Sequence, residues 1–166
     1  MTMDDHTQEI SNALFDFTGE LAATSSLDHS VKLWDLGSGK IIQSFTHHKD
    51  EVLDIMFNST GTLLASCSAD ATARVYSVAE GTNTAVLSGH SKSVNKVVFN
   101  PQGNKILTAS EDGTGKIWDL MGKEFQTLSG HSDEIFSCAF NYEGDTIITG
   151  SKDNSCILWK SSPVSN

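Results

Sequence analysis

The sequence predicts an all-β fold made of four copies of one repeated unit, and three observations support this. Four histidines recur at intervals of 42, 42 and 41 residues: His6, His48, His90 and His131. An aromatic residue follows each histidine after 28 residues: Trp34, Tyr76, Trp118 and Trp159. Each unit holds short apolar or β-branched segments bounded by turn residues. A period near 40 that opens on Gly-His and closes on Trp-Asp is typical of the blades of a β-propeller.

The last unit shows the expected strands in their simplest order. Three segments lie between Gly130 and Lys160: Glu134–Phe140, Thr146–Ser151 and Ser155–Trp159. A phenylalanine stands nine residues after each histidine, at Phe15, Phe57, Phe99 and Phe140. A four-residue turn with Asp or Asn first and Gly fourth follows it in every copy, ending at Gly19, Gly61, Gly103 and Gly144. This pattern suits a type I turn between two antiparallel strands.

The second strand of each unit ends in two columns of hydroxyl side chains. The first column holds Thr24, Ser66, Thr108 and Thr149, and the second holds Ser26, Ser68, Ser110 and Ser151. An aspartate opens the next turn, 22 residues after each histidine: Asp28, Asp70, Asp112 and Asp153. A hydrogen-bonded chain from aspartate to histidine, hydroxyl and indole N–H would satisfy these groups if they are buried together. The sequence leaves open which hydroxyl column takes part.

A fourth, outer strand is expected in the first three units only. These strands are Lys40–Phe45, Thr82–Leu87 and Lys123–Leu128. The units span about residues 6–46, 47–88, 89–129 and 130–160, with a polar leader at 1–5 and a tail at 161–166. The predicted fold is therefore a partial propeller of four antiparallel blades, the last of which lacks its outer strand.

These columns resemble those of WD-repeat propellers, in which the aspartate, histidine, hydroxyl and tryptophan network is a structural device. The resemblance covers His6 to Lys160 and departs from the pattern at few positions. Asp5 and His47 replace the glycine before the histidine, Tyr76-Ser77 replaces Trp-Asp, and Lys160 replaces the final aspartate. Since Tyr76 still offers an O–H group, we expect a weakened second blade rather than a lost one.

Four segments are similar to the C-terminal half of the dynein assembly factors with WD repeats. They are Asp133 to Tyr142, Ile148 to Asn154, Leu64 to Asp70 and Phe99 to Asn104. That family is about twice as long, with roughly eight repeats. The resemblance implies a cytoplasmic and ciliary or flagellar factor, which helps to assemble outer-arm dynein and pass it to intraflagellar transport. Its partners would be dynein subunits or transport adaptors. The alternative is a general WD peptide-binding adaptor, such as a substrate receptor of a ubiquitin ligase or a centriolar protein.

Four blades leave two sheet faces and edges open, and unpaired edges promote association. Three arrangements would cover them. The chain forms half of a longer propeller, or two copies pair as four plus four blades, or the four blades close alone. The third fits poorly, because the wedge shape of WD blades suits larger rings of about seven or eight.

Composition limits the classes of function. The net charge of −10 argues against nucleic-acid and anionic-membrane binding, which need a basic face. The chain shows no standard signal peptide and no apolar run long enough to span a membrane. Cys67, Cys138 and Cys156 all fall in expected strands, without CxxC spacing, so we expect reduced core cysteines of a cytosolic protein.

No catalytic, metal or cofactor site is predicted. Ser, His and Asp recur in every unit, and four equivalent triads without a nucleophile elbow favour a structural role. The pair His47-His48 with Asp50 has no further ligand at useful spacing for a metal. The chain is therefore expected to be non-enzymatic and to need no cofactor.

The variable columns are the candidate partner-binding positions. One column lies five residues after each histidine: Ser11, Leu53, Asn95 and Phe136. The other precedes each aspartate: Leu27, Ala69, Glu111 and Lys152. Leu27, Leu53 and Phe136 are apolar at expected rim positions and form the predicted contact patch, although Leu53 and Phe136 would also suit packing onto the strand beneath. An acidic rim that favours a basic partner, or simply solvated surface, would come from Asp50, Glu51, Asp133 and Glu134.

Overall fold

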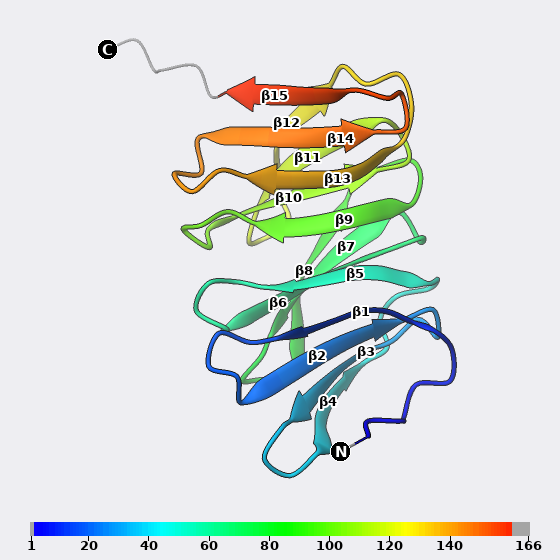
Figure 1. Cartoon of the computed structure of the whole chain (residues 1–166), viewed down its shortest axis with the longest axis vertical. Helices are drawn as coiled ribbons and strands as arrows, with labels where there is room; N and C mark the ends of the chain where they lie inside the picture. Colours follow the sequence, from blue (N-terminus) through cyan, green and yellow to red (C-terminus); the bar gives the residue numbers. More distant parts are fainter. Residues whose placement is uncertain (1, 161–166) are drawn as a thin grey trace.

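A computed structural model describes residues 2–160 and shows four antiparallel sheets stacked side by side (Figure 1). Each sheet is one blade, and its strands follow the order of the chain. Blade one contains β1 (Ile10–Phe15), β2 (Leu21–Ser26), β3 (Val31–Asp35) and β4 (Lys40–Phe45). Blade two contains β5 (Val52–Phe57), β6 (Leu63–Ser68), β7 (Thr72–Ser77) and β8 (Thr82–Ser88). Blade three contains β9 (Val94–Phe99), β10 (Lys105–Ser110), β11 (Thr114–Asp119) and β12 (Glu124–Ser129).

Blade four has three strands within residues 2–160. They are β13 (Ile135–Phe140), β14 (Thr146–Ser151) and β15 (Cys156–Lys160). The all-β fold, the four blades and the missing outer strand of blade four are thus confirmed. The expected strand bounds differ from the observed ones by at most one residue at each end.

The turns between the first and second strands have the expected geometry. In each blade the glycine N–H donates to the carbonyl of the residue three positions earlier, as from Gly103 to Asn100 at 2.9 Å. The four glycines at this position have φ between 69° and 76°, a region that side chains with a Cβ rarely occupy. The Asn or Asp side chain then accepts a hydrogen bond from the start of the next strand, as Asn58 does from Leu63 N–H at 3.0 Å.

Every first strand contains a β-bulge that the sequence pattern did not predict. In blade one the register jumps between Ile10 and Asn12, and in blade two it jumps between Val52 and Asp54. Blades three and four show the same shift, so the residues left out of pairing are Ser11, Leu53, Asn95 and Phe136. A bulge redirects the side chain of the extra residue, and here it does so at one column of all four blades.

The core lies between blades. The first strand of each later blade packs against the inner strands of the blade before it, so β9 contacts both β5 and β6. Three apolar clusters fill the three interfaces, and each draws residues from two adjacent blades. The stack forms an open arc with the two chain ends at its opposite extremities (Figure 1). Blades one and four therefore each have one face without a neighbouring blade.

Candidate protein-interaction face

A repeated hydrogen-bond network fixes one end of each blade. Each histidine Nδ1 lies 2.9 Å from the Oδ2 atom of its aspartate, and each histidine Nε2 lies 2.7–2.8 Å from a Ser or Thr hydroxyl. The aspartate also accepts the N–H of the residue after the histidine, as from Ser91 at 3.1 Å. Because these bonds join the loop before each blade to the turn between its second and third strands, they set the shape of the surface above them.

The structure also answers which hydroxyl column joins the network. The partners of the histidines are Thr24, Ser66, Thr108 and Thr149. The second column has another role, because each of its serines accepts the aspartate N–H within the turn, as Ser110 does from Asp112 at 3.1 Å. Both columns are therefore structural.

Blade two lacks the last link of the network. Trp34, Trp118 and Trp159 donate their indole N–H to the threonine hydroxyl of their own blade at 2.8–2.9 Å. Tyr76 occupies the same column, fully buried, and its hydroxyl makes no hydrogen bond of good geometry among residues 2–160. Burial raises the pKa of this hydroxyl, and only weaker interactions, with Ser66 and Asn83 among others, oppose that rise. The O–H group expected from the sequence thus lies beside the network without a well-formed bond to it.

The network holds its aspartates in the charged state. Burial alone would raise the pKa of Asp112, but hydrogen bonds from Thr114, His90 and the Ser91 N–H lower it to about 2. The pKa values of Asp28, Asp70 and Asp153 are lowered as well. For Asp153 the largest cause is the hydrogen bond from the Ser155 hydroxyl. These perturbed carboxylates are held by hydrogen bonds within the framework.

The two predicted rim columns meet at the same end of every blade. The residue before each aspartate donates its N–H to a carbonyl two residues before the bulge, as Ala69 does to Glu51 at 2.9 Å and Lys152 to Glu134 at 2.9 Å. Leu27 and Glu111 make the same bond to Glu9 and Ser93. The bulge residue and the turn residue are thus brought side by side four times along the arc.

The rim positions differ in how far they are available to a partner. Ser11 donates to the carbonyl of Val52 at 2.6 Å, and Asn95 donates to the carbonyl of Ile135 at 3.0 Å, so both side chains link neighbouring blades. Ser11, Phe136 and Lys152 are exposed, whereas the other five rim residues are half-buried, namely Leu27, Leu53, Ala69, Asn95 and Glu111. Phe136 is therefore the apolar rim residue most open to contact.

Two acidic residues, Asp133 and Glu134, closely precede Phe136 on blade four. Glu134 pairs with Lys152 at 3.1 Å, and this pairing raises the pKa of Lys152. Asp133 is exposed beside them, and Asp50 and Glu51 lie at the equivalent place on blade two. This end of the arc thus combines an exposed aromatic ring with carboxylates.

Sequence reasoning missed a polar link among the residues that follow the bulges of blades one, two and three. Asp54 is buried and accepts hydrogen bonds from Asn12 Nδ2 at 2.7 Å and from the Val97 N–H at 3.2 Å. Lys96 adds an ion pair to Asp54 at 3.1 Å. This polar cluster joins blades one, two and three. A polar side chain at the same column of every apolar first strand was the signal that would have revealed it.

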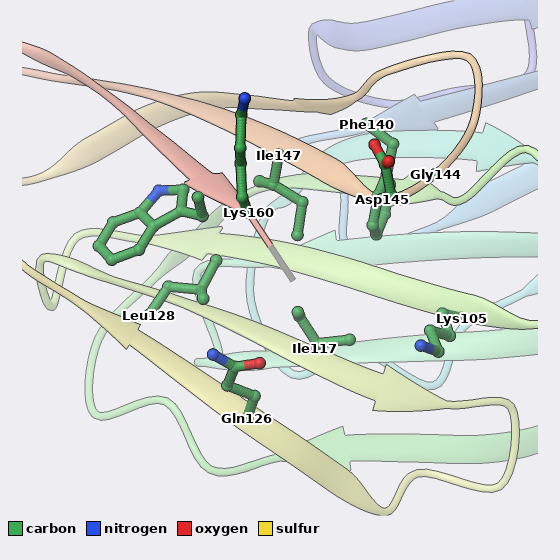
Figure 2. Close-up of a pocket in the computed structure, with 10 residues that line it drawn as sticks. Lys105, Ile117, Gln126, Leu128, Phe140, Gly144, Asp145, Ile147 and Lys160 are labelled. Atoms are coloured by element: carbon green, nitrogen blue, oxygen red, sulfur yellow. The ribbon is translucent and has the colours of Figure 1, made fainter. Parts of the chain in front are cut away.

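Two cavities lie away from the rim. One of about 340 Å³ opens between blades three and four and is lined by Ile117, Gln126, Leu128, Ile147 and Trp159, among others (Figure 2). The other, of about 310 Å³, lies near the turns that follow the first strands and is lined by Met56, Phe99, Pro101 and Phe140, among others. Neither is lined by a rim residue.

Three further features bear on the type of site. Residues 2–160 contain no group of three or more His, Cys, Asp or Glu side chains arranged to hold a metal ion. In the same part of the chain no helix is long and apolar enough to cross a membrane. Cys67 and Cys138 are buried, and burial raises the pKa of both thiols, that of Cys138 to about 12. Cys156, expected in the core, is exposed because no blade covers its face.

Comparison with protein families identifies the class. The model of the WD domain, G-beta repeat, matches residues 1–35, 39–77, 81–119 and 122–160. The chain belongs to the WD-repeat family. Repeats of this kind indicate a protein-interaction scaffold in general. No curated protein matches the chain.

Proposed function

We propose that this chain is a non-catalytic scaffold that binds a protein partner on the rim described above. The observation that carries the proposal is the division of each blade into constant and variable columns. The Asp, His and Ser/Thr positions repeat in all four blades and are occupied by hydrogen bonds to each other. The rim columns above them change from blade to blade. A constant framework that presents a variable surface is the arrangement expected of a binding module.

Phe136 is the proposed anchor of the contact. An exposed aromatic ring bordered by carboxylates favours a partner segment that offers an apolar side chain beside basic residues. Leu27 and Leu53 extend the apolar contact on blades one and two, where their half-burial leaves a smaller exposed area.

For the particular process, we propose a role in the assembly or transport of outer-arm dynein in the cytoplasm and the cilium or flagellum. The support is the similarity of blades two to four to the dynein assembly factors with WD repeats. The partners would then be dynein subunits or adaptors of intraflagellar transport. A general adaptor role, in ubiquitin ligation or at centrioles, is the competing function.

The test compares two exposed aromatics at opposite ends of blade four. The purified chain, its Phe136→Ala variant and its Tyr142→Ala variant are each used to capture proteins from a lysate of ciliated cells, and the captured dynein and transport subunits are quantified. We expect Phe136→Ala to weaken binding by roughly tenfold or more, as for an interface hot spot. Tyr142 is fully exposed in the turn at the far end of the blade, so Tyr142→Ala should bind normally.

Three results would count against parts of the proposal. Equal loss in both variants, or in neither, would show that the rim is not the contact surface. Capture of only non-ciliary partners in a Phe136-dependent manner would overturn the dynein assignment and favour the adaptor role. Labelling of the chain by an activity-based serine probe would contradict the non-catalytic part.

A further inference from the structure

The open face of blade four carries side chains that the other blades bury fully or in part. Leu158 is 64% exposed, whereas Leu33 and Val75, in the same column of blades one and two, are 0% exposed and Ile117 of blade three is half-buried. Ile148 is 43% exposed, whereas Ala23, Ala65 and Leu107 in its column are 0% exposed. In the first three blades this face packs against the first strand of the next blade.

The open face of blade one exposes the opposite partner of the blade-to-blade interface, namely the first-strand residues that pack against a preceding blade elsewhere. Ile10 is 50% exposed, while Val52, Val94 and Ile135 in its column are 0% exposed. Phe15 is 69% exposed, while Phe57 and Phe99 are almost fully buried. In blades two to four these first-strand residues pack against the preceding blade. The two ends of the arc are thus the two halves of one blade-to-blade interface.

The sizes of the interface residues show which face blade four is suited to meet. Each internal apolar cluster contains a second-strand residue of one blade and a first-strand residue of the next at the same two sequence columns: Ala23 and Ile55, Ala65 and Val97, and Leu107 and Cys138. In the first two clusters a small second-strand residue accompanies a larger first-strand residue. In the third cluster a large second-strand residue accompanies a small first-strand residue, so the combined volume is maintained, as close packing requires.

The same rule fits the two free ends to each other. The second-strand residue of blade four is the large Ile148, and the first-strand residue of blade one is the small Ala13. An isoleucine opposite Ile55 would overfill the cluster and an alanine opposite Ala23 would leave a void, both of which cost stability. Ile148 opposite Ala13 restores the volume that the internal interfaces hold.

We propose that the open face of blade four binds the open face of blade one in a second copy of this chain. Two copies joined in this way at both ends form a closed ring of eight blades with two identical junctions. A head-to-tail contact of this kind makes a ring when its rotation closes and an open filament when it does not. Eight blades lie within the range that propellers adopt.

Cys156 provides a native reporter for the junction. It lies on the open face of blade four, in the column of Val31 and Ala73, both of which are fully buried by the next blade. The other two cysteines are buried within the arc. A closed ring should therefore react with a thiol reagent at none of its cysteines, an open folded arc at one, and an unfolded chain at all three.

The first experiment combines light scattering on a sizing column with thiol counting on the same fractions. We expect a single species of twice 17.9 kDa with Cys156 protected, and release of a monomer with one reactive thiol on dilution. A folded monomer at every concentration with Cys156 reactive would overturn the proposal. So would a dimer in which Cys156 reacts freely.

Matched variants locate the contact. Leu158→Glu replaces a side chain that is exposed in the single arc, so it should leave the fold intact and lower the mass to 17.9 kDa. Met121→Glu changes a residue that is exposed in the turn after β11, away from both end faces, and should remain dimeric. Equal masses for the two variants would contradict the assigned junction.

A cross-link distinguishes a ring from other dimers. In a Cys156→Ser background, Ile148→Cys with Ala13→Cys should form disulfides between copies on mild oxidation. A closed ring stops at the covalent dimer, whereas an open head-to-tail chain gives a ladder of higher oligomers on a non-reducing gel. The ladder, or the absence of cross-linking in a folded protein, would refute the eight-blade ring.

Discussion

Blades two and three each have four strands in the same order, and each lies between two neighbouring blades. They nevertheless anchor one end of the sheet in different ways. In blade three the Trp118 indole donates to Thr108 at 2.8 Å and completes the chain of hydrogen bonds from Asp112. In blade two the histidine still contacts Ser66, but Tyr76 ends beside it with an unpaired hydroxyl. One blade thus combines burial and hydrogen bonding in its aromatic residue, and the other relies on burial alone.

The residue before the histidine also differs between blades two and three. A Cβ atom at Gly89 would lie only 3.1 Å from Cη2 of Trp118, which is a tight contact, although blade one combines Asp5 at this position with Trp34. Blade two has His47 at this position, with its ring 5.8 Å from that of Tyr76. Phe45, in β4 of blade one, stacks on Tyr76 with the ring centroids 4.2 Å apart. The equivalent residue next to Trp118 is Leu87, in β8 of blade two, which belongs to the same apolar cluster as Trp118.

This comparison shows that the anchor is a group of residues that must fit together. A smaller aromatic ring in blade two is accompanied by a larger side chain on each side of it. The substitutions keep the space filled, which preserves the contribution of close packing. The cost is one buried polar group without a partner. Tyr76 and His47 are therefore best regarded as one compensated change.

The largest expected difference between the blades comes from changing each aromatic residue to phenylalanine. Trp118→Phe removes the hydrogen bond to Thr108 and part of the buried volume, so it should lower the free energy of unfolding by about 1–3 kcal/mol. Tyr76→Phe removes only an unpaired buried hydroxyl and should leave stability within about 1 kcal/mol of the wild type, or raise it. Urea unfolding of both variants measures the difference. A greater loss for Tyr76→Phe would show that its hydroxyl is bonded in solution.

A smaller effect is expected from rebuilding the blade-three arrangement in blade two. Tyr76→Trp alone should destabilise the protein, because the larger indole would have to fit a fully buried site whose neighbours include the His47 ring, 5.8 Å from that of Tyr76. With His47→Gly added, the indole can reach the Ser66 hydroxyl. We expect a favourable coupling free energy of about 1–2 kcal/mol in the double-mutant cycle. Additive effects of the two substitutions would contradict the proposed fit between them.

The sequence predicted the framework well because the framework is repetitive. The columns of His6 and Asp28 recur at fixed spacing, and recurrence identified both the strands and the hydrogen-bonded groups. The outer strands were placed within one residue, since their alternation is bounded by turn residues. Because the framework residues repeat in the sequence, they occupy equivalent places in every blade. Their structural role could therefore be predicted from the sequence alone.

Features that depend on packing between blades were less accessible. Ser11 and Asn95 stood in a rim column, and only the bulge and the neighbouring carbonyl show that they join two blades. Cys156 was expected to be buried because its strand is apolar, but burial of that face requires a further blade. Likewise, the missing hydrogen bond of Tyr76 depends on where a shorter side chain ends. The residue pattern within one repeat does not specify how side chains pack against the neighbouring blade.

The smallest expected effect is a dependence of stability on pH that comes from His90 in blade three. Burial lowers the pKa of His90 below its ordinary value, although the hydrogen bond to Asp112 acts in the opposite direction. Lys116 also lowers this pKa and Glu124 raises it. Between the pKa of the folded state and that of the unfolded state, near 6.5, the unfolded chain binds more protons. Stability should therefore be complete above about pH 6.5 and decline as the pH falls below it.

The measurement is the free energy of unfolding at pH 7.5 and pH 5.5 for the wild type and His90→Gln. The variant should be less stable at both values, because it disturbs the bonds to Asp112 and Thr108. Its free energy of unfolding should nevertheless fall less between pH 7.5 and pH 5.5 than that of the wild type does. Protonation of Asp112 also lowers the free energy of unfolding, but this loss should not appear at pH 7.5 or at pH 5.5. Because the pKa of Asp112 is about 2 in the folded state, the loss falls between about pH 4 and 2. Equal pH slopes in the two proteins would mean that the buried imidazole of blade three does not set this dependence.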